Sequence, residues 1–243
     1  MTTERSRICK GCWQQLRLPV PLHGVASLPF RLFGIRPSRM NPNTCTICEM
    51  MFTKVMRTRN ITVDVSILFA DLRDYTGLSQ RLPQDRLAAL LDSFYDLCAE
   101  AVWAHDGLLN KTIGDAVMAV FNFPIRHPDH AARAVAAARD IQRRAGEGGY
   151  APAGERDGGG ALAIGVGIDS GKVSFGEFGR SHRDLTAIGT VVNTAARAQG
   201  VAQPGQILVT RSVRERSASA LAAAEGRLYE LKGMTEPVEL YAA

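Results

Sequence analysis

The chain has 243 residues, of which 46% are hydrophobic and 22% are charged, and its net charge is +5. This length allows one large domain or a domain with a small module, and the hydrophobic share is that of an ordinary globular core. Because no apolar run approaches the roughly 18 residues of a membrane span, and no signal-peptide core is visible, we expect a cytoplasmic protein with no membrane partner.

The positive charge belongs to the first 50 residues, which hold seven basic and two acidic residues, whereas the rest of the chain has 22 of each. Four of the five cysteines lie in the same segment, as Cys9-x-x-Cys12 and Cys45-x-x-Cys48. Two such pairs can place four thiolates around a tetrahedral zinc ion. The reducing cytosol favours metal over disulfides, so we predict structural zinc; an iron–sulfur cluster and free or redox-active cysteines are the alternatives.

The segment between the two cysteine pairs is rich in proline and glycine, which break helices and strands. We therefore predict a loop clamped by the ion, with metal binding supplying the folding energy of a four-cysteine, zinc-ribbon-like module over residues 1–50. His23 is interpreted as a solvated or packing residue because four cysteines complete a site. Cys98 is expected to be a small core residue.

The amphipathic stretch Glu49–Arg57 predicts a linker helix, which we place at residues 51–60. This helix either pairs with the same helix of a second copy in a dimer or packs on its own domain. The module before it has an unknown regulator as its expected partner.

The remainder of the chain, residues 61–243, alternates between strand and helix patterns. We predict a buried strand at Val65–Ala70, a helix over Leu87–Val102, and a hairpin from Leu108–Lys111 and Ala116–Phe121. Asp129 is a candidate N-cap for a helix ending near Ala145, and Gly146–Gly160 is expected to be a flexible loop.

A further strand is predicted at Leu162–Asp169, with a turn at Ser170–Gly171 leading into Lys172–Gly176. The last turns of Val191–Arg197 have a helical pattern. Short strands are predicted at Ile207–Thr210, Leu228–Leu231 and Val238–Tyr241. This order indicates an α+β sandwich with helices on one face of a largely antiparallel sheet.

Two aspartates, Asp71 and Asp115, each follow an apolar run. A carboxylate at the end of a buried strand is costly unless a cation meets it, so the pair suggests a shared divalent ion. Taken singly, each could equally be a solvated turn residue or a helix cap.

Several motifs together resemble the successive signatures of class III nucleotidyl cyclases, over roughly residues 61–243. The matching segments are Phe69–Arg73, Lys111–Asp115, Ile164–Gly171, Thr186–Gly189 and Asn193–Arg197. The resemblance implies a ferredoxin-like cyclase sandwich that converts a nucleoside triphosphate to its 3′,5′-cyclic monophosphate and pyrophosphate, in cyclic-nucleotide signalling. It also implies two Mg²⁺ or Mn²⁺ ions per active site, bound by Asp71, Asp115 and the Leu72 carbonyl.

The resemblance assigns the purine to Lys111 and Thr186. Lys111 stands where adenylyl cyclases carry lysine and guanylyl cyclases glutamate, and a lysine can donate to adenine N1 but not to the protonated N1 of guanine. Thr186 resembles a bacterial threonine-variant subclass. The expected enzyme is therefore an adenylate cyclase using ATP, with guanylate cyclase and a catalytically silent nucleotide sensor as alternatives.

Asn193 and Arg197 match the catalytic pair that orients the ribose and covers transition-state charge, and Lys232 matches a lysine that contacts the outer phosphates. Asn193 and Arg197 are four residues apart and would share one helix face. Taken alone, Lys111 could be a solvated strand residue, Arg197 a surface charge and Asn193 a cap. Asp74 and Thr190 depart from the family pattern without removing a group that the chemistry needs.

A nucleic-acid partner is disfavoured, because the N-terminal charge is modest and its aromatic residues are few. The expected assembly is a head-to-tail homodimer with shared active sites. Lys111 and Asp115 lie four residues apart, yet the resemblance assigns them to opposite ends of one nucleotide. In a two-fold dimer, Asp71 and Asp115 of one copy would face the remaining site residues of the other.

Overall fold

The structure is a computed structural model that describes residues 5–58, 60–148, 162–178 and 184–243. Its centre is a mixed sheet with the strand order β2-β3-β1-β4-β6-β8-β7, and β5 pairs with β4 beside this row. The strands are β1 Ile61–Leu72, β2 Leu108–Ile113, β3 Ala116–Phe121, β4 Ile164–Phe178, β5 Asp184–Ile188, β6 Ile207–Thr210, β7 Gly226–Tyr229 and β8 Val238–Ala242. Only the β4–β6 pair is parallel among the described strand pairs, so the largely antiparallel α+β sandwich is confirmed.

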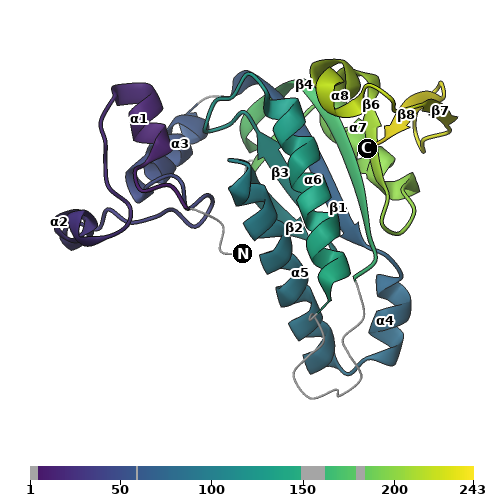
Figure 1. The fold of residues 1–243 in the computed structure, drawn as a ribbon, viewed down its shortest axis with the longest axis horizontal. Coiled ribbons are helices and arrows are strands. Elements are labelled where there is room, and N and C mark those ends of the chain that lie inside the picture. Colours follow the sequence, from purple (N-terminus) through teal and green to yellow (C-terminus); the bar gives the residue numbers. More distant parts are fainter. Residues whose placement is uncertain (1–4, 59, 149–161, 179–183) are drawn as a thin grey trace.

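Helices pack on both faces of the sheet (Figure 1). They are α1 Lys10–Leu16, α2 Leu28–Leu32, α3 Thr46–Thr58, α4 Tyr75–Arg81, α5 Gln84–Ala104, α6 His130–Glu147, α7 Thr190–Val201, α8 Arg211–Arg216 and α9 Ala218–Leu221. The long helices α5 and α6 bury Leu68 and Ala70 of β1 on one face. The expectation that helices cover one face alone was wrong, because β1 has apolar residues on both faces. The alternate residues Ile67 and Phe69 pack on the opposite face with α7 and the end of α3. Because side chains alternate between the two faces along β1, this strand contributes to two separate hydrophobic cores.

Strand β4 differs from the prediction, because the expected turn at Ser170–Gly171 is absent from it. Ser170 pairs with Ser66 and Gly171 with Val65, and the ladder between β4 and β1 continues to Phe175. A twelve-residue β1 supplies partners beyond Asp169, so the serine and glycine stay in the strand although both favour turns. Strand β7 also begins and ends two residues earlier than predicted, because Leu231 leaves the strand to pack in the core.

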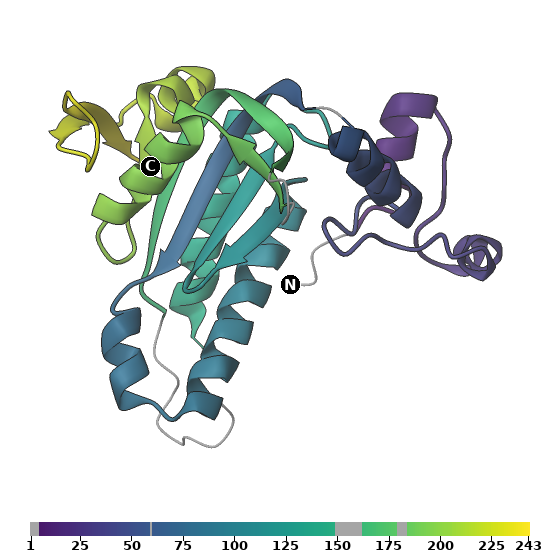
Figure 2. The ribbon, with the colours of Figure 1, turned by 180° about the vertical axis from the view of Figure 1, so that it is seen from behind.

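The N-terminal segment lies to one side of the sheet, and Figure 2 shows it from behind in purple and dark blue. The prediction of a loop without regular structure was wrong at α2, where Pro29 occupies the first turn. Proline is tolerated there because the first helical N–H groups have no intrahelical partner. The predicted linker helix is present as α3, which begins at Thr46 and already contains Cys48. The domain boundaries at residues 50 and 60 stay predictions.

Cys98 is fully buried in α5, as expected for a core residue. Asp129 precedes α6 at the N-cap position, but its carboxylate accepts from Arg133 rather than from the helix backbone. The predicted flexible loop Gly146–Gly160 lies outside the described residues from residue 149 onward. Within the part of the chain that is described, no helix is both long and apolar enough to cross a membrane.

Candidate active site and four-cysteine metal centre

The structure brings Asp71 and Asp115 together at one end of the sheet. Asp71 lies near the end of β1 opposite Ala116, and the Leu72 amide donates to the Asp115 carbonyl at 3.0 Å. Burial, together with the negative charge of Asp115, raises the pKa of Asp71 to about 6, and the positive charge of Arg73 opposes both effects. Two half-buried carboxylates therefore share this corner.

These residues fit a divalent cation. Arg73 Nη1 is 3.8 Å from Asp71 Oδ1, which is too long for a hydrogen bond. Carboxylate and backbone carbonyl oxygens are the ligands that Mg²⁺ and Mn²⁺ prefer. A cation here would remove the repulsion that raises the pKa of Asp71.

Arg73 is anchored beside this corner. Its Nη2 donates to the Gln199 carbonyl of α7 at 2.6 Å, and its guanidinium lies over Gly165, where a Cβ would come within 2.1 Å of Nη2. Its Nε is buried and has no hydrogen-bond partner among the described residues. Gly165 is therefore required for the approach of the arginine, and Arg73 ties β1 to α7.

Asp74 is one of the two residues that depart from the family pattern, and its backbone conformation accounts for the aspartate. Its φ is +60°, in the left-handed region that favours glycine. Aspartate tolerates this region better than most residues, and the Asp74 carboxylate accepts from Arg81 at 2.7 Å. The other departure, Thr190, is the first residue of α7, and its carbonyl accepts from the Thr194 hydroxyl. Both residues fit their backbone positions.

Lys111 reaches its face of the sheet through a β-bulge. Leu109 pairs with Ala119 and Lys111 with Met118, so Asn110 is an extra residue in β2. The bulge reverses the alternation and puts Lys111 on the same face as Met118. Met118 packs with α7 and with Ala187 of β5. Lys111 thus shares a face with the elements that carry Thr186 and Asn193.

The extra residue Asn110 joins the two strands assigned to the purine. Its Nδ2 donates to the Leu185 carbonyl of β5 at 3.0 Å. Lys111 follows Asn110 and Thr186 follows Leu185, so this bond fixes the two predicted base-reading positions relative to each other. The Asn110 Oδ1 is buried without a hydrogen-bond partner in the described structure.

The other predicted residues are exposed in a single copy of the chain. Asn193 and Arg197 lie on the outer side of α7, opposite the buried Val191 and Ala195. Their spacing of four places them on one helix face, as predicted. Lys232 lies in the exposed turn between β7 and β8. Within a single copy, Asp71 and Asp115 therefore lie close together, whereas the side chains of Asn193, Arg197 and Lys232 face solvent.

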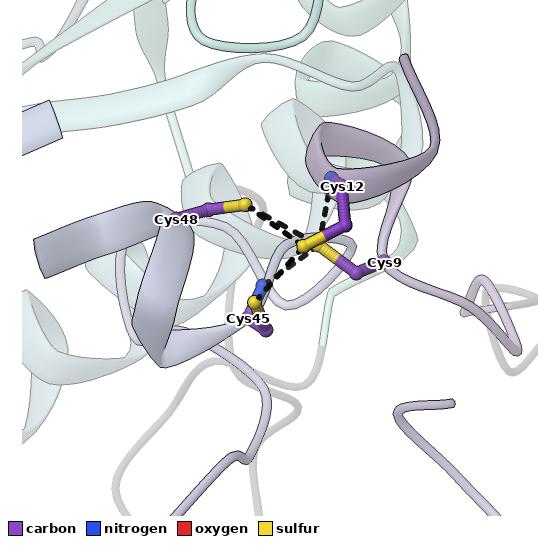
Figure 3. A group of neighbouring side chains, drawn as sticks. All are labelled: Cys9, Cys12, Cys45 and Cys48. Atoms are coloured by element: carbon purple, nitrogen blue, oxygen red, sulfur yellow. Dashed lines mark hydrogen bonds between the residues drawn. The ribbon is translucent and has the colours of Figure 1, made fainter. Parts of the chain in front are cut away.

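Cys9, Cys12, Cys45 and Cys48 converge in one buried cluster, with their sulfur atoms all within 4.8 Å of one another. Figure 3 shows the four side chains pointing toward a common centre. The Cys12 sulfur is 3.4 Å from that of Cys48 and 3.6 Å from that of Cys45. Zinc–sulfur bonds of about 2.3 Å in a tetrahedron imply sulfur separations of about 3.8 Å. The cluster therefore fits a tetrahedral metal ion, and all four thiols are free of disulfides.

The backbone around the cluster is arranged for thiolates. The amides of Cys12 and Cys45 both donate to the Cys9 sulfur, at 3.4 and 3.2 Å. Hydrogen bonds from Cys48 and Cys9 lower the pKa of Cys45 to about 2, whereas burial raises that of Cys12 to about 12. A bound cation would displace the protons that these thiols hold. His23 is not part of this cluster.

Sequence reasoning missed the residues that hold the site in place. Asn110 belongs to no motif with a known role, and the hydroxyl of Tyr95, which donates to the Gly114 carbonyl beside Asp115, lies on a helix that precedes the hairpin. The one available signal was the polar Asn110 directly after the apolar pair Leu108 and Leu109. Nothing in the local pattern identified its partner.

Residues 58–242 match the family described as the adenylate and guanylate cyclase catalytic domain. Adenylate cyclase 1 of Rhizobium meliloti is 31% identical over 142 residues, which cover 57% of this chain and 21% of that protein. An uncharacterized protein of Mycobacterium tuberculosis is 32% identical over 185 residues, covering 72% of this chain and 32% of the relative. The chain thus spans less than a third of the length of these relatives.

Solved structures share the fold. The adenylyl cyclase CyaB from P. aeruginosa superposes with a TM-score of 0.64 at 24% identity, covering 76% of this chain and 95% of that one. The guanylate cyclase domain of RhGC from Catenaria anguillulae, solved in complex with GTP, gives a TM-score of 0.63 at 26% identity, covering 74% and 94%.

Proposed function

The chain belongs to the family of adenylate and guanylate cyclase catalytic domains, and on that premise we propose that it is an adenylate cyclase that converts ATP to 3′,5′-cyclic AMP and pyrophosphate. The observation that carries the proposal is the pairing of Asp71 and Asp115, whose mutual repulsion raises the pKa of Asp71 beyond the effect of burial. Perturbed carboxylates of this kind are typical of functional sites.

Asp71, Asp115 and the Leu72 carbonyl would hold two Mg²⁺ or Mn²⁺ ions. Such ions, when bound, lower the pKa of the attacking ribose 3′-hydroxyl and neutralise charge on the phosphates. The contribution of the chain is to fix both carboxylates. The backbone bond between Leu72 and Asp115 does this from the β1 side, and Tyr95 holds the turn from the helix side.

Lys111 and Thr186 are proposed to select the purine. The Lys111 ammonium can donate to adenine N1, and the Thr186 hydroxyl can accept from the adenine amino group. Asn110 supports this assignment because it holds the two strands in register. The alternative substrate is GTP, since relatives of both specificities share the fold. Lys111 favours ATP.

Asn193 and Arg197 are proposed as the catalytic pair, and Lys232 as a ligand of the outer phosphates. Asn193 would orient the ribose by hydrogen bonding, and Arg197 would cover the charge that develops on the transferred phosphoryl oxygens. Both project from the solvent-facing side of α7, where a second molecule can approach them.

The proposed active species is a two-fold homodimer with shared sites. Asp71 and Asp115 are half-buried at the sheet end, whereas Asn193, Arg197 and Lys232 are exposed, so a site that combines them would form between two copies. For the N-terminal cluster we propose a structural zinc ion bound by Cys9, Cys12, Cys45 and Cys48. An iron–sulfur cluster would instead give a visible chromophore and stoichiometric iron.

The test is to incubate the pure full chain with ATP or GTP and either Mg²⁺ or Mn²⁺, and to separate the cyclic products. We expect cyclic AMP in excess over cyclic GMP. Absence of both products with every ion would favour the silent sensor, and an excess of cyclic GMP would favour guanylate cyclase.

A further inference from the structure

Asp106 is a buried carboxylate that binds two parts of the chain at once. Its side chain is 3% exposed and follows α5 with a φ of +60°. From the four-cysteine module (residues 5–50), Lys10 Nζ donates at 2.6 and 2.7 Å and Asn43 Nδ2 at 2.9 Å. From the catalytic domain, His127 Nε2 lies at 3.1 Å and Arg133 Nη1 at 3.3 Å. Because a buried charge is costly without donors, Asp106 favours the docked module.

Both module donors lie beside the cysteines. Lys10 lies between Cys9 and Cys12, and Asn43 is two residues before Cys45. The Lys10 amide also donates to the Asn43 carbonyl at 2.9 Å, which holds the two cysteine pairs together. A metal ion that gathers the four sulfurs would therefore also bring Lys10 and Asn43 together in front of Asp106.

Three further contacts near Asp106 join the module to the catalytic domain. Asn41 Nδ2 donates to the Gly107 carbonyl at 2.7 Å, and the Trp103 indole donates to the Met40 carbonyl at 2.8 Å. Arg5 pairs with Glu100 of α5 at 2.8 Å. The module has no acidic residue from position 5 to 48, and its docking site presents two acidic ones, so the charges are complementary.

The docked module packs against the strands assigned to the purine. Met40 of the module and Phe52 of α3 line a small cavity together with Leu108 of β2 and Leu185 of β5. Leu108 is three residues before Lys111, and Leu185 precedes Thr186 and accepts from Asn110. Movement of the module would therefore release Leu108 and Leu185, which lie close in sequence to the two proposed purine-reading positions.

We propose that Asp106 is a positioning residue for the purine site: it clamps the metal-loaded four-cysteine module against strands β2 and β5 and so fixes Lys111 relative to Thr186. The part of this inference that concerns the purine rests on the proposed function. The part that concerns docking does not.

The first test is Asp106→Asn in the full chain, because asparagine tolerates the same backbone conformation but carries no charge. Metal content should stay at that of the wild type. Hydrogen exchange should increase in residues 108–113 and 184–188, and the KM for ATP should rise roughly tenfold with a smaller change in kcat. The ATP-to-GTP preference should fall, and the Mn²⁺ dependence should not change.

The matched control is Asp129→Asn. Asp129 is also paired with Arg133, at 3.0 Å, but it is exposed, and its ion-pair partners Arg133 and His127 both lie in the catalytic domain. The Asp129→Asn variant should keep the hydrogen-exchange rates and the KM for ATP of the wild type. Should Asp106→Asn fail to fold, Lys10→Met tests the same bond from the module side without altering the catalytic domain, and the same pattern is expected.

The metal is tested by replacing Cys9 and Cys12 together with serine. This variant should lose about one zinc per chain and should reproduce the exchange pattern of Asp106→Asn. Wild-type exchange and KM in folded Asp106→Asn and Lys10→Met proteins would overturn the proposal. If the wild type forms no cyclic nucleotide, the proposed function fails, and hydrogen exchange alone still decides whether Asp106 clamps the module.

Discussion

Asn110 Nδ2 donates a 3.0 Å hydrogen bond to the carbonyl oxygen of Leu185, and this bond links a bulge in β2 to the edge strand β5. The two residues are 75 positions apart and directly precede Lys111 and Thr186. The spacing of the proposed purine ligands therefore depends on a side chain that is not itself one of them.

Replacement of Asn110 should therefore alter substrate binding without removing a proposed ligand. In Asn110→Asp, a carboxylate oxygen would face the Leu185 carbonyl, so we expect the KM for ATP to rise roughly tenfold. The control is Asn122→Asp. In the wild type, Asn122 Nδ2 donates a similar 2.9 Å hydrogen bond to the Asp64 carbonyl, at a site away from β5, and the variant loses this bond. Equal kinetics for the two variants would remove Asn110 from the purine site.

Asp71→Ala and Asp115→Ala should each abolish turnover while the fold remains intact. Loss of a metal ligand removes several kcal/mol of transition-state stabilisation, so kcat should fall by roughly a thousandfold or more. Cyclic AMP production and circular dichroism of the same samples measure the two effects. Near-normal activity of Asp71→Ala at saturating Mn²⁺ would contradict the metal assignment, and Asp74→Asn serves as a control at a neighbouring exposed carboxylate.

The stability of the metal-free protein should decrease between about pH 4 and pH 6. Burial, together with the Asp115 charge, raises the pKa of Asp71 from 3.8 to about 6, so the folded chain retains this proton where the unfolded chain has lost it. Stability from protonated Asp71 is thus present at low pH and lost as the pH rises through about 6.

Thermal unfolding of the metal-free protein at about pH 4.5 and about pH 7.5, on either side of the folded-state pKa, measures this effect. Asp71→Asn, which cannot ionise, should remove the Asp71 contribution, and Mn²⁺ should stabilise the wild type more at the higher pH than at the lower. A pH dependence that is identical in the wild type and Asp71→Asn would contradict the assignment.

Lys111→Glu should weaken the use of ATP and raise the relative use of GTP. A glutamate accepts from the protonated N1 of guanine, whereas it leaves adenine N1 without a donor, and such unpaired polar groups are costly in a binding site. The ratio of kcat/KM for the two nucleotides is the measurement. An unchanged ratio would place Lys111 outside the purine site.

A mixture of Asp71→Ala and Arg197→Ala proteins should recover activity although each is inactive alone. In a mixed two-fold dimer, one site carries both lesions and the other carries neither. With random exchange about a quarter of all sites are intact. Each variant mixed with buffer is the control. Demonstrated subunit exchange without recovery, or full activity of a demonstrated monomer, would rule out the shared site.

The sequence by itself determined the parts of this protein that depend on local pattern. The alternation of apolar residues identified β1 and β3, the helical spacing identified α5 and α6, and the cysteine pairs identified the four-cysteine cluster that the structure confirms as a buried group. Asp71 and Asp115 were found because each follows an apolar strand, and strand period and turn chemistry are properties of neighbouring residues.

Only the tertiary structure decided where β4 continues, which face Lys111 occupies and what holds the module. Ser170 and Gly171 remain in a strand because β1 pairs with them from 104 and 106 residues away in sequence. Lys111 changes face because one extra residue enters β2 opposite Met118. Asp106 meets Lys10 across 96 residues. Each outcome depends on a long-range partner, and local propensity carries no information about that partner until the chain has folded.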